Sequence, residues 1–310
     1  MQALVLKSTG ILFRLCTDDG KLVQARLAGK VRLDHRKSTS PVVVGDRVEI
    51  DAETDEGVIT KILPRKNYII RKSVNLSKQT HILAANIDQA FLLATLVFPK
   101  ISTGFIDRFL VTAEAYQIPA TIIFNKTDLL DKDLKKIQKE IVKMYTSVGY
   151  PCYEISALDK KDADKIKKLL KNKITLLAGH SGAGKSSLIN SIQPGLNLKT
   201  ADLSDIHLKG KHTTTFSELH KLDDGGYIID TPGIKELGLV EMKKEEVGHY
   251  FPEMRALMND CKFNNCTHTT EPGCAVLKAL EEKKISLGRY HNYMSILSGD
   301  ETKWNDWETQ

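Results

Sequence analysis

The sequence predicts a multidomain chain with an N-terminal β-barrel, a central α/β domain and a C-terminal, mostly helical domain that holds a metal. Three observations support this prediction. Short alternating strands fill residues 1 to about 68, apolar strands alternate with amphipathic helices from about residue 85, and three cysteines fall within fourteen residues at 261–274. A chain of 310 residues has room for three such domains, and we expect their boundaries at 1–68, 69–240 and 241–310.

The N-terminal segment has the period-two pattern of half-buried strands. Apolar and polar residues alternate over 22–27, and 44–50 gives a turn followed by another alternating strand. Several short strands in so small a segment indicate a closed barrel, and the OB-fold is the commonest barrel of this size. A β-domain with only a structural role remains the alternative. The basic segment 30–37 is suited to phosphate contacts.

The central segment reads as a doubly wound α/β domain. Its candidate strands are near-continuous apolar runs, which suit a parallel sheet covered on both faces, and they lie at 90–95, 120–124, 174–178 and 227–229. Apolar residues at helical spacing predict a helix that ends near Gly149, and they are Leu134, Ile137, Ile141, Met144 and Val148.

A glycine-rich phosphate-binding loop follows the strand at 174–178. The segment 179–186 matches the Walker A pattern, in which backbone N–H groups and a helix N-terminus face the phosphates. Lys185 would bridge the terminal phosphates, and the Ser186 hydroxyl would ligate Mg²⁺. A glycine turn with only a structural role is the alternative. The expected nucleotide contacts here are Gly179, His180, Ser181, Gly182, Ala183, Gly184, Lys185, Ser186 and Ser187.

A second motif resembles the guanine-specificity motif of translation-factor-like GTPases: Asn125, Lys126, Thr127 and Asp128, at the end of the strand 120–124. The Asp128 carboxylate can accept two hydrogen bonds from guanine, a pair of donors that adenine lacks. The alternative is a helix N-cap formed by Thr127 or Asp128. Ser156 and Ala157 resemble the Ser-Ala loop that supports the guanine ring in the same families.

Two further segments resemble the switch regions of a GTPase. Asp230 ends a strand and would hold Mg²⁺ through a water, while the N–H group of Gly233 would meet the γ-phosphate. Upstream, Thr213 or Thr214 would be the switch I ligand of Mg²⁺. The alternatives are a Pro-Gly turn after Asp230 and a threonine run that reflects strand propensity.

The cysteine-rich segment has the donor set of a structural zinc site: Cys261, Cys266, His268 and Cys274. Three thiolates and one imidazole match a closed tetrahedral site, and four protein ligands leave no open position for catalysis. Buried free cysteines are the alternative.

The order of the motifs is circularly permuted, because the guanine motif and the Ser-Ala loop precede Walker A. With the zinc ligands, these motifs resemble the ribosome small-subunit-dependent GTPase A family of circularly permuted bacterial GTPases, over almost the whole chain. The resemblance implies a late-acting factor in small-subunit maturation, whose GTPase activity the subunit stimulates. It also implies that the OB-fold and the zinc domain bind ribosomal RNA. Chain order suggests that nucleotide state passes from switch II to the cysteine-rich region.

The position after the switch II glycine departs from the broader GTPase pattern. Many G proteins have a glutamine there that orients the attacking water, but this chain has Ile234. We therefore expect slow intrinsic turnover and take His212 as the candidate catalytic group, beside Lys185. An exposed loop histidine with no such role is the alternative.

Composition is compatible with these assignments and excludes a membrane span. The net charge of +6 fits an RNA partner without establishing one, and no apolar run reaches the length that a bilayer requires. No signal peptide is recognisable, so we expect a cytoplasmic location. Nothing in the sequence requires an oligomer, so we expect a monomer. On the family resemblance, the better candidate RNA contacts are Arg65, Lys66, Arg71 and Lys72, which flank the barrel exit, whereas the lysines of 160–171 more often form a solvated face.

Two other functions remain open from the sequence. One is an RNA-binding assembly protein that uses GTP as a structural ligand with negligible turnover. The other is a P-loop ATPase or kinase in which the resemblance at 125–128 is coincidental.

Overall fold

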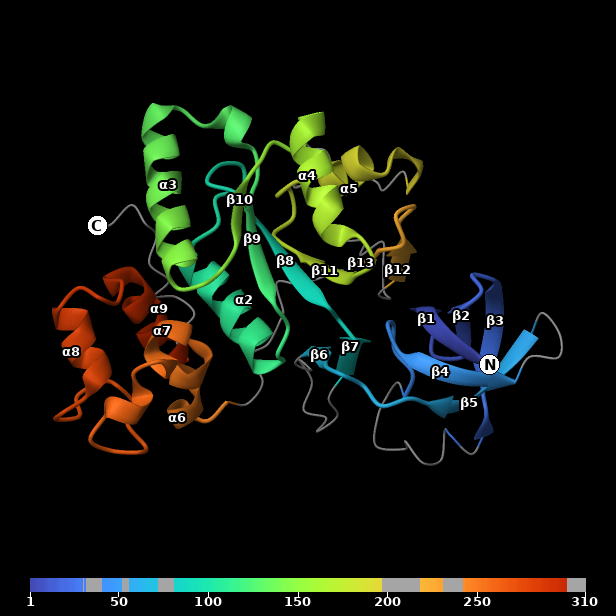
Figure 1. Ribbon diagram of the computed structural model, residues 1–310, viewed down its shortest axis with the longest axis horizontal. Helices are drawn as coiled ribbons and strands as arrows, with labels where there is room; N and C mark the ends of the chain where they lie inside the picture. The colour runs from blue at the N-terminus through green and yellow to red at the C-terminus, as the bar shows by residue number, and fades with distance from the viewer. Residues whose placement is uncertain are drawn as a thin grey trace. The chain divides into compact units, whose positions relative to one another are not determined.

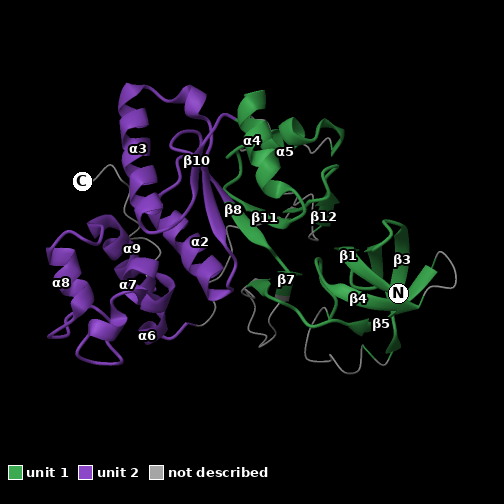
Figure 2. Cartoon of the chain, in the orientation of Figure 1, with its two compact units in different colours: residues 1–91, 157–238 green, residues 92–156, 239–310 purple. Residues whose placement is uncertain are grey.

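The computed structural model describes residues 1–29, 31, 41–51, 56–71, 81–196, 218–230 and 242–299 (Figure 1). Arg71, His81 and Asp230 are described at the backbone only. The chain folds into two compact units, each of which joins segments far apart in the sequence (Figure 2). One unit comprises 1–91 and 157–238, and the other comprises 92–156 and 239–310. No helix in the described ranges is both long and apolar enough to cross a bilayer.

The N-terminal strands close into a five-stranded barrel. Its strands are β1 (Gln2–Ser8), β2 (Leu12–Thr17), β3 (Leu22–Leu27), β4 (Arg47–Asp51) and β5 (Glu56–Ile62). They pair in the order β1-β2-β3-β5-β4, and β1 pairs again with β4 to close the barrel. Only the β3–β5 pairing is parallel among these strands. This five-stranded closure confirms the predicted OB-fold. The inward residues of the alternating pattern, such as Phe13, Leu15 and Val23, form its core.

A second hairpin, β6 (Tyr68–Arg71) and β7 (His81–Ala85), follows the barrel and lies against its 43–46 loop. Gly45 lies at φ +87°, and a Cβ there would be 2.1 Å from the carbonyl oxygen of Ala85. The Ala85 N–H donates to the carbonyl of Val44 at 2.9 Å. Glycine is therefore required at position 45 by both its backbone conformation and the close approach of the hairpin.

A buried ion pair between Asp46 and Arg65 holds the 43–46 loop in place. The fully buried Asp46 carboxylate accepts two hydrogen bonds from Arg65, each 2.7 Å long, and a third from the Val43 N–H at 2.8 Å. Arg65 also donates to the carbonyl of Pro41. The sequence offers Arg65 as an RNA contact, but these bonds make it a structural residue of the barrel.

The first unit also contains β11 (Ile174–Ala178), β12 (Glu218–Lys221), β13 (Tyr227–Asp230), α4 (Lys160–Leu170), α5 (Lys185–Ile192) and a 3₁₀ turn, η2 (Pro194–Leu196). Strands β11 and β13 are parallel, as their apolar runs predict, and β12 is antiparallel to β13. β12 also meets β1 of the barrel, where Lys7 pairs with Glu218 at 2.7 Å. Strand β8 (Gln89–Ala94) begins in this unit and ends in the other.

The second unit begins with α2 (Thr103–Ala115), β9 (Ala120–Phe124), η1 (Thr127–Leu129), α3 (Lys132–Ser147) and β10 (Cys152–Glu154). Strands β9 and β10 are parallel. Asp131 caps α3 by accepting from the Leu134 N–H at 2.8 Å, and the chain leaves the helix through Gly149 at φ +99°. Gly149 thus ends the helix as predicted, because glycine adopts this conformation without strain.

The C-terminal part of the second unit is helical, as predicted, with α6 (Lys244–Val247), α7 (Pro252–Arg255), α8 (Ala275–Glu281), α9 (Leu287–Ser298) and the 3₁₀ turns η5 (Gly248–Tyr250) and η6 (Met258–Asp260). Its apolar core contains Phe251, Met254, Val276 and Tyr293, together with Val111 of α2. The cysteine-rich region therefore shares one core with a helix of the α/β domain.

A buried arginine joins the same two parts. The guanidinium of Arg289, on α9, contacts the Asp107 carboxylate of α2 at 2.5 Å and forms two hydrogen bonds, of 2.5 and 3.0 Å, with Glu253. Its side chain is 1% exposed, and Asp107 is 0% exposed. Asn292 donates to the other oxygen of Asp107 at 2.6 Å. Burial raises the pKa of Asp107, and the positive charge of Arg289 acts against that rise.

Candidate functional site

The Walker A loop has the strand–loop–helix setting that phosphate binding needs. The loop follows β11 and leads into α5, and its three glycines all have positive φ: Gly179 at 141°, Gly182 at 82° and Gly184 at 96°. Residues with a Cβ rarely adopt such angles, so the glycines allow the tight curl that turns backbone N–H groups inward. Gly184 is the N-cap of α5 and has no side chain to satisfy the N–H groups of the first turn.

Lys185 folds back over this loop. Its ammonium donates to the carbonyl of Gly179 at 2.6 Å and to the carbonyl of His180 at 2.9 Å. Ala183 is fully buried, whereas Lys185, Ser186 and Ser187 are half-buried. The loop is anchored by the buried Ala183, while the polar side chains of Lys185, Ser186 and Ser187 stay partly accessible. This pattern fits a binding loop better than a turn with only a structural role.

The backbone of Asp230 lies beside the strand that precedes this loop. Asp230 ends β13, which is parallel to β11, and it is paired with Leu177, two residues before Gly179. The carboxyl ends of adjacent parallel strands meet at the same edge of the sheet. The other predicted switch residues, His212, Thr213, Thr214 and Gly233, lie outside the described residues.

The guanine motif of the second unit is held by the backbone at the end of β9. Asn125 is 2% exposed, and its N–H donates to the carbonyl of Ala94 at 2.8 Å. Lys126 has a left-handed conformation at φ 65°, and its ammonium donates to the carbonyl of Phe98. Burial lowers the pKa of Lys126, and the Asp128 carboxylate acts in the opposite direction.

The capping alternative for this motif is wrong. The short 3₁₀ helix η1 has no side-chain cap, and the following helix, α3, is capped by Asp131. Asp128 is exposed, so its carboxylate is available to a ligand. Positive φ at Lys126 and burial of Asn125 are features of a binding loop.

The predicted Ser-Ala loop follows β10 directly. Within the second unit, the Ile155 N–H donates to the carbonyl of Phe124 at 2.8 Å, and the Thr127 N–H donates to the carbonyl of Ile155 at 3.2 Å. The structure therefore ties the stretch before Ser156 to the guanine motif. Ser156 is 8% exposed. Within the first unit, the Ser191 hydroxyl of α5 donates to the carbonyl of Ala157 at 2.6 Å.

The four predicted metal ligands come together in the second unit. The ligand atoms of Cys261, Cys266, His268 and Cys274 all lie within 4.8 Å of one another. His268 Nδ1 is 3.4 Å from Cys274 Sγ and 3.7 Å from Cys261 Sγ, and the two sulfurs are 4.0 Å apart. Tetrahedral bonds to zinc place such ligands roughly 3.3 to 3.8 Å apart, so this Cys₃His cluster is compatible with zinc.

The electrostatics of the cluster also favour a cation. Burial raises the pKa of Cys266 to about 12 and raises the pKa of Cys274, while it lowers the pKa of His268. A neutral imidazole is the form that binds metals, and a divalent cation offsets the cost of burying thiolates. His268 uses Nδ1 toward the sulfurs, which leaves Nε2 buried without a partner in the described residues.

Residues that sequence reasoning missed shape the loop around His268, which has a left-handed backbone at φ 55°. Tyr290 donates to the carbonyl of His268 at 2.8 Å, and Tyr293 donates to the carbonyl of Thr267 at 2.5 Å. Glu271 accepts from the N–H groups at 267, 269 and 270. Burial would raise the pKa of Glu271, but bonds from the Thr267 hydroxyl and from backbone N–H groups lower it to about 2. Only the tyrosine spacing on α9 hints at this arrangement in the sequence.

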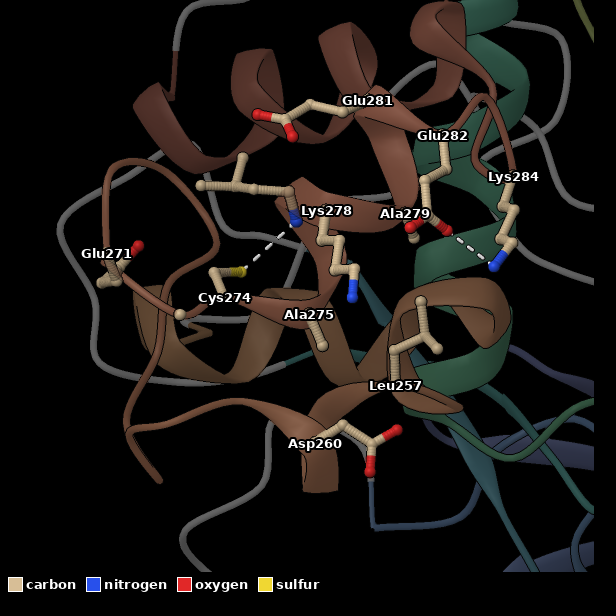
Figure 3. Close-up of a pocket in the computed structure, with 12 residues that line it drawn as sticks. Leu257, Asp260, Glu271, Cys274, Ala275, Lys278, Ala279, Glu281, Glu282 and Lys284 are labelled. Carbon is tan, nitrogen blue, oxygen red and sulfur yellow. Dashed lines mark hydrogen bonds and ion pairs between the residues drawn. The ribbon is translucent and has the colours of Figure 1, made fainter.

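A cavity of about 750 Å³ lies beside Cys274 (Figure 3). Its charged lining residues are Asp260, Glu271, Lys278, Glu281, Glu282 and Lys284. Carboxylates outnumber ammonium groups there, so this cavity is electrostatically unsuited to nucleotide phosphates. Inside it, Cys274 Sγ accepts from the Leu277 N–H, which orients the thiol and caps α8.

Comparisons with known proteins show the family to which the chain belongs. The family model described as RsgA GTPase matches residues 62–240. A curated protein of Bacteroides fragilis named small ribosomal subunit biogenesis GTPase RsgA is 52% identical over 302 residues, covering 97% of each chain. A protein of the same name from Christiangramia forsetii is 50% identical over 308 residues, covering 98% of each chain.

Solved structures give the same result for the fold. YjeQ from Thermotoga maritima superposes with a TM-score of 0.80 at 35% identity, over 96% of this chain and 97% of that one. YloQ, described as a circularly permuted GTPase, superposes with a TM-score of 0.77 at 29% identity, over 99% and 96%. The permuted motif order, the Walker A geometry and these matches have one explanation. The chain belongs to the RsgA GTPase family and is a GTP hydrolase.

Proposed function

We propose that the chain binds GTP with Mg²⁺ through its Walker A, guanine and switch motifs and uses the nucleotide as a switch in small-subunit maturation. The positive-φ glycines of the Walker A loop carry this proposal, because they bring backbone N–H groups to a helix start that no side chain caps. Lys185 would exchange its two carbonyl contacts for the terminal phosphates. Ser187 would contact the phosphates, while the Ser186 hydroxyl would ligate Mg²⁺.

Guanine recognition would fall to Asn125, Lys126, Thr127 and Asp128, with support from Ser156 and Ala157. The exposed Asp128 carboxylate has the chemistry to accept from the guanine N1–H and amino groups. Family membership supports this assignment, and so does the left-handed turn at Lys126 that exposes Asp128.

The Mg²⁺ ligands would be Ser186, one threonine of switch I (Thr213 or Thr214), and Asp230 through a water, while Gly233 would contact the γ-phosphate. The strand register, which brings the backbone of Asp230 beside Leu177, supports the role of Asp230. When bound, the ion would neutralise charge that develops on the phosphates during hydrolysis.

The metal of the Cys₃His cluster would be one structural Zn²⁺, held by Cys261, Cys266, His268 and Cys274. The soft thiolate donors favour zinc over magnesium or calcium, and four protein ligands favour a structural site.

The partner would be the small ribosomal subunit and its RNA. Curated relatives at 50–52% identity are named small ribosomal subunit biogenesis GTPases, and the barrel has a fold that commonly binds RNA. Such a partner implies a cytoplasmic location, and we propose that the chain acts there as a monomer.

The test is phosphate release from GTP, measured alone, with purified small subunits and with purified large subunits at one low salt concentration. We expect slow release alone and strong stimulation by the small subunit only. Tight GTP binding without stimulation would contradict the proposal and favour a protein that uses GTP as a structural ligand.

A further inference from the structure

Helix α3 carries a row of lysines on the face opposite its core contacts. Gln138, Ile141 and Tyr145 are the buried residues of this helix. Five lysines are exposed, and they are Lys132, Lys135, Lys136, Lys139 and Lys143. At 3.6 residues per turn, all five lie within a sector of about 100°, and the row is about 16 Å long. We call this row the α3 lysine stripe.

The stripe carries more positive charge than the acidic residues of its own helix neutralise. None of its lysines forms an ion pair with another residue in the described part of the chain, although Asp133 and Glu140 are on the same helix and Asp131 caps it. Like charges one helical turn apart destabilise a helix by about 0.2 to 0.5 kcal/mol for each pair. The stripe contains several such pairs, among them Lys135–Lys139 and Lys139–Lys143. The five lysines outnumber the two acidic residues of the helix, Asp133 and Glu140, so α3 carries excess positive charge on this face.

Helix α4 provides the contrast, because it is equally rich in lysine but largely neutralised. Lys160 pairs with Asp164 at 2.8 Å, Lys165 pairs with Asp162 at 2.8 Å, and Lys167 pairs with Asp224 at 3.5 Å. The lysines of 160–171 thus form the solvated face that the sequence suggests, and the two helices differ in pairing rather than in composition.

A hollow of about 410 Å³ lies beside the stripe. It is lined by Lys139, Val142, Lys143, Thr146, Ser147 and Glu154. The Glu154 carboxylate is bound by the amide of Gln138 at 2.5 Å, so one of its oxygens is already occupied. The Ser147 hydroxyl donates to the carbonyl of Met144 at 2.7 Å, so the ammonium groups of Lys139 and Lys143 are the donors of this recess that suit phosphate oxygens.

We propose that the α3 lysine stripe is a contact surface for the phosphate backbone of RNA in the small ribosomal subunit, an inference that rests on the proposed function. The exposed face has no aromatic or large apolar side chain, which membrane insertion or the centre of a protein interface would require. A row of lysine charges fits a polyanion such as the RNA backbone, which the row would bind through charge and independently of base sequence.

The experiment compares two full-length variants with the same change in charge. One replaces the stripe (K132Q, K135Q, K136Q, K139Q and K143Q), and the control replaces five lysines of α4 (K160Q, K161Q, K165Q, K167Q and K168Q). Dissociation constants for purified small subunits, with a non-hydrolysable GTP analogue, are measured at three salt concentrations. Thermal unfolding and subunit-free GTP hydrolysis verify that both variants are folded.

We expect the stripe variant to bind at least 10-fold more weakly at low salt, and the α4 variant to bind within 2-fold of the unmodified chain. The slope of log affinity against log salt is negative, and each lost phosphate contact reduces its magnitude by about 0.7 to 0.9. If all five lysines touch phosphates, the magnitude should fall by about 3.5 to 4.5. Binding to protein-free small-subunit RNA should fall in parallel.

Three results would overturn the inference. The two variants could lose affinity equally, the stripe variant could keep its affinity for protein-free RNA, or only its binding to phosphatidylserine vesicles could fall. The second result would assign the stripe to a ribosomal protein and the third to a membrane. If the unmodified chain neither binds small subunits nor is stimulated by them, the proposed function fails together with the inference.

Discussion

Arg289 joins the cysteine-rich region to α2 through a buried charge network. Its guanidinium lies between two carboxylates and within 5.8 Å of three aromatic ring centres, those of Tyr145, Tyr150 and Phe251. A buried charge is tolerated only when its partners and hydrogen bonds are complete, and here Asp107 and Glu253 provide them.

Replacing this arginine should therefore destabilise the protein strongly. Arg289→Met keeps much of the side-chain volume but leaves the Asp107 and Glu253 carboxylates buried without their cation. We expect the free energy of unfolding to fall by about 3 to 5 kcal/mol in urea titrations. Arg255→Met is the control, because its ion pair with Glu114 is half-exposed and should contribute about 1 kcal/mol or less. Equal losses in the two variants would show that Arg289 does not have this role.

Glu271 supports the loop of the Cys₃His cluster without being one of the four proposed zinc ligands. Its carboxylate organises the turn that carries His268, since it accepts from three backbone N–H groups along 267–270. A glutamine of the same shape would turn an NH₂ group toward some of these N–H donors.

We expect Glu271→Gln to weaken zinc binding by about 10- to 100-fold, the usual effect of removing a group that orients a metal ligand. Competition with a chromophoric chelator measures this affinity directly. Glu281→Gln, at an exposed position on the same cavity, should leave it unchanged. Unaltered affinity in Glu271→Gln would refute the role of the turn.

His212 is proposed as a catalytic group because the chain has Ile234 where many G proteins have a glutamine. If His212 orients water, His212→Ala should lower subunit-stimulated phosphate release by about 100-fold or more while GTP affinity stays the same. Stimulated release at the unmodified rate would remove His212 from the mechanism.

Among the elements, the barrel and the β6–β7 hairpin meet at a position where only glycine fits. Gly45→Ala would place a methyl group 2.1 Å from the carbonyl oxygen of Ala85 and would add strain at φ +87°. Gly20→Ala separates the two effects, because Gly20 has φ +86° and a methyl group there would have no neighbouring atom within 4 Å.

We expect Gly20→Ala to lower the free energy of unfolding by about 1 kcal/mol, and Gly45→Ala to lower it by at least about twice that amount. Thermal or urea unfolding of the two variants checks this difference. Similar losses would mean that the hairpin shifts to accommodate the methyl group.

Elements governed by local pattern could be predicted from the sequence, and long-range pairings could not. Alternation over 22–27 predicts a barrel strand, Gly149 predicts the end of α3, and the cysteine spacing predicts the cluster. The pairing of Arg289 with Asp107 joins residues 182 positions apart, and no local signal marks it. The same holds for Arg65. Its basic neighbours in the sequence suggest an exposed residue, but it forms an ion pair with the buried Asp46.

At the scale of the whole chain, the permuted motif order places the cysteine-rich region directly after the predicted switch II segment. In this order the chain runs from Asp230, the proposed Mg²⁺ residue, to that region without crossing another predicted nucleotide motif. The region shares a core with α2, the helix that precedes the strand of the guanine motif. We therefore expect nucleotide state and the placement of the cysteine-rich region to be coupled by their chain connection and by this shared core.

We expect this hydrolase to recognise guanine and to be stimulated by the small ribosomal subunit. A change of nucleotide specificity tests guanine recognition and subunit stimulation in one experiment. Asp128→Asn replaces the carboxylate that guanine's donors require with an amide that pairs with xanthine. Phosphate release by this variant is measured with GTP and with xanthosine triphosphate, each with and without small subunits. We predict that GTP turnover falls by at least about 100-fold and that small subunits stimulate release from xanthosine triphosphate. Unchanged GTP turnover, or no stimulation with either nucleotide in a folded variant, would contradict the claim.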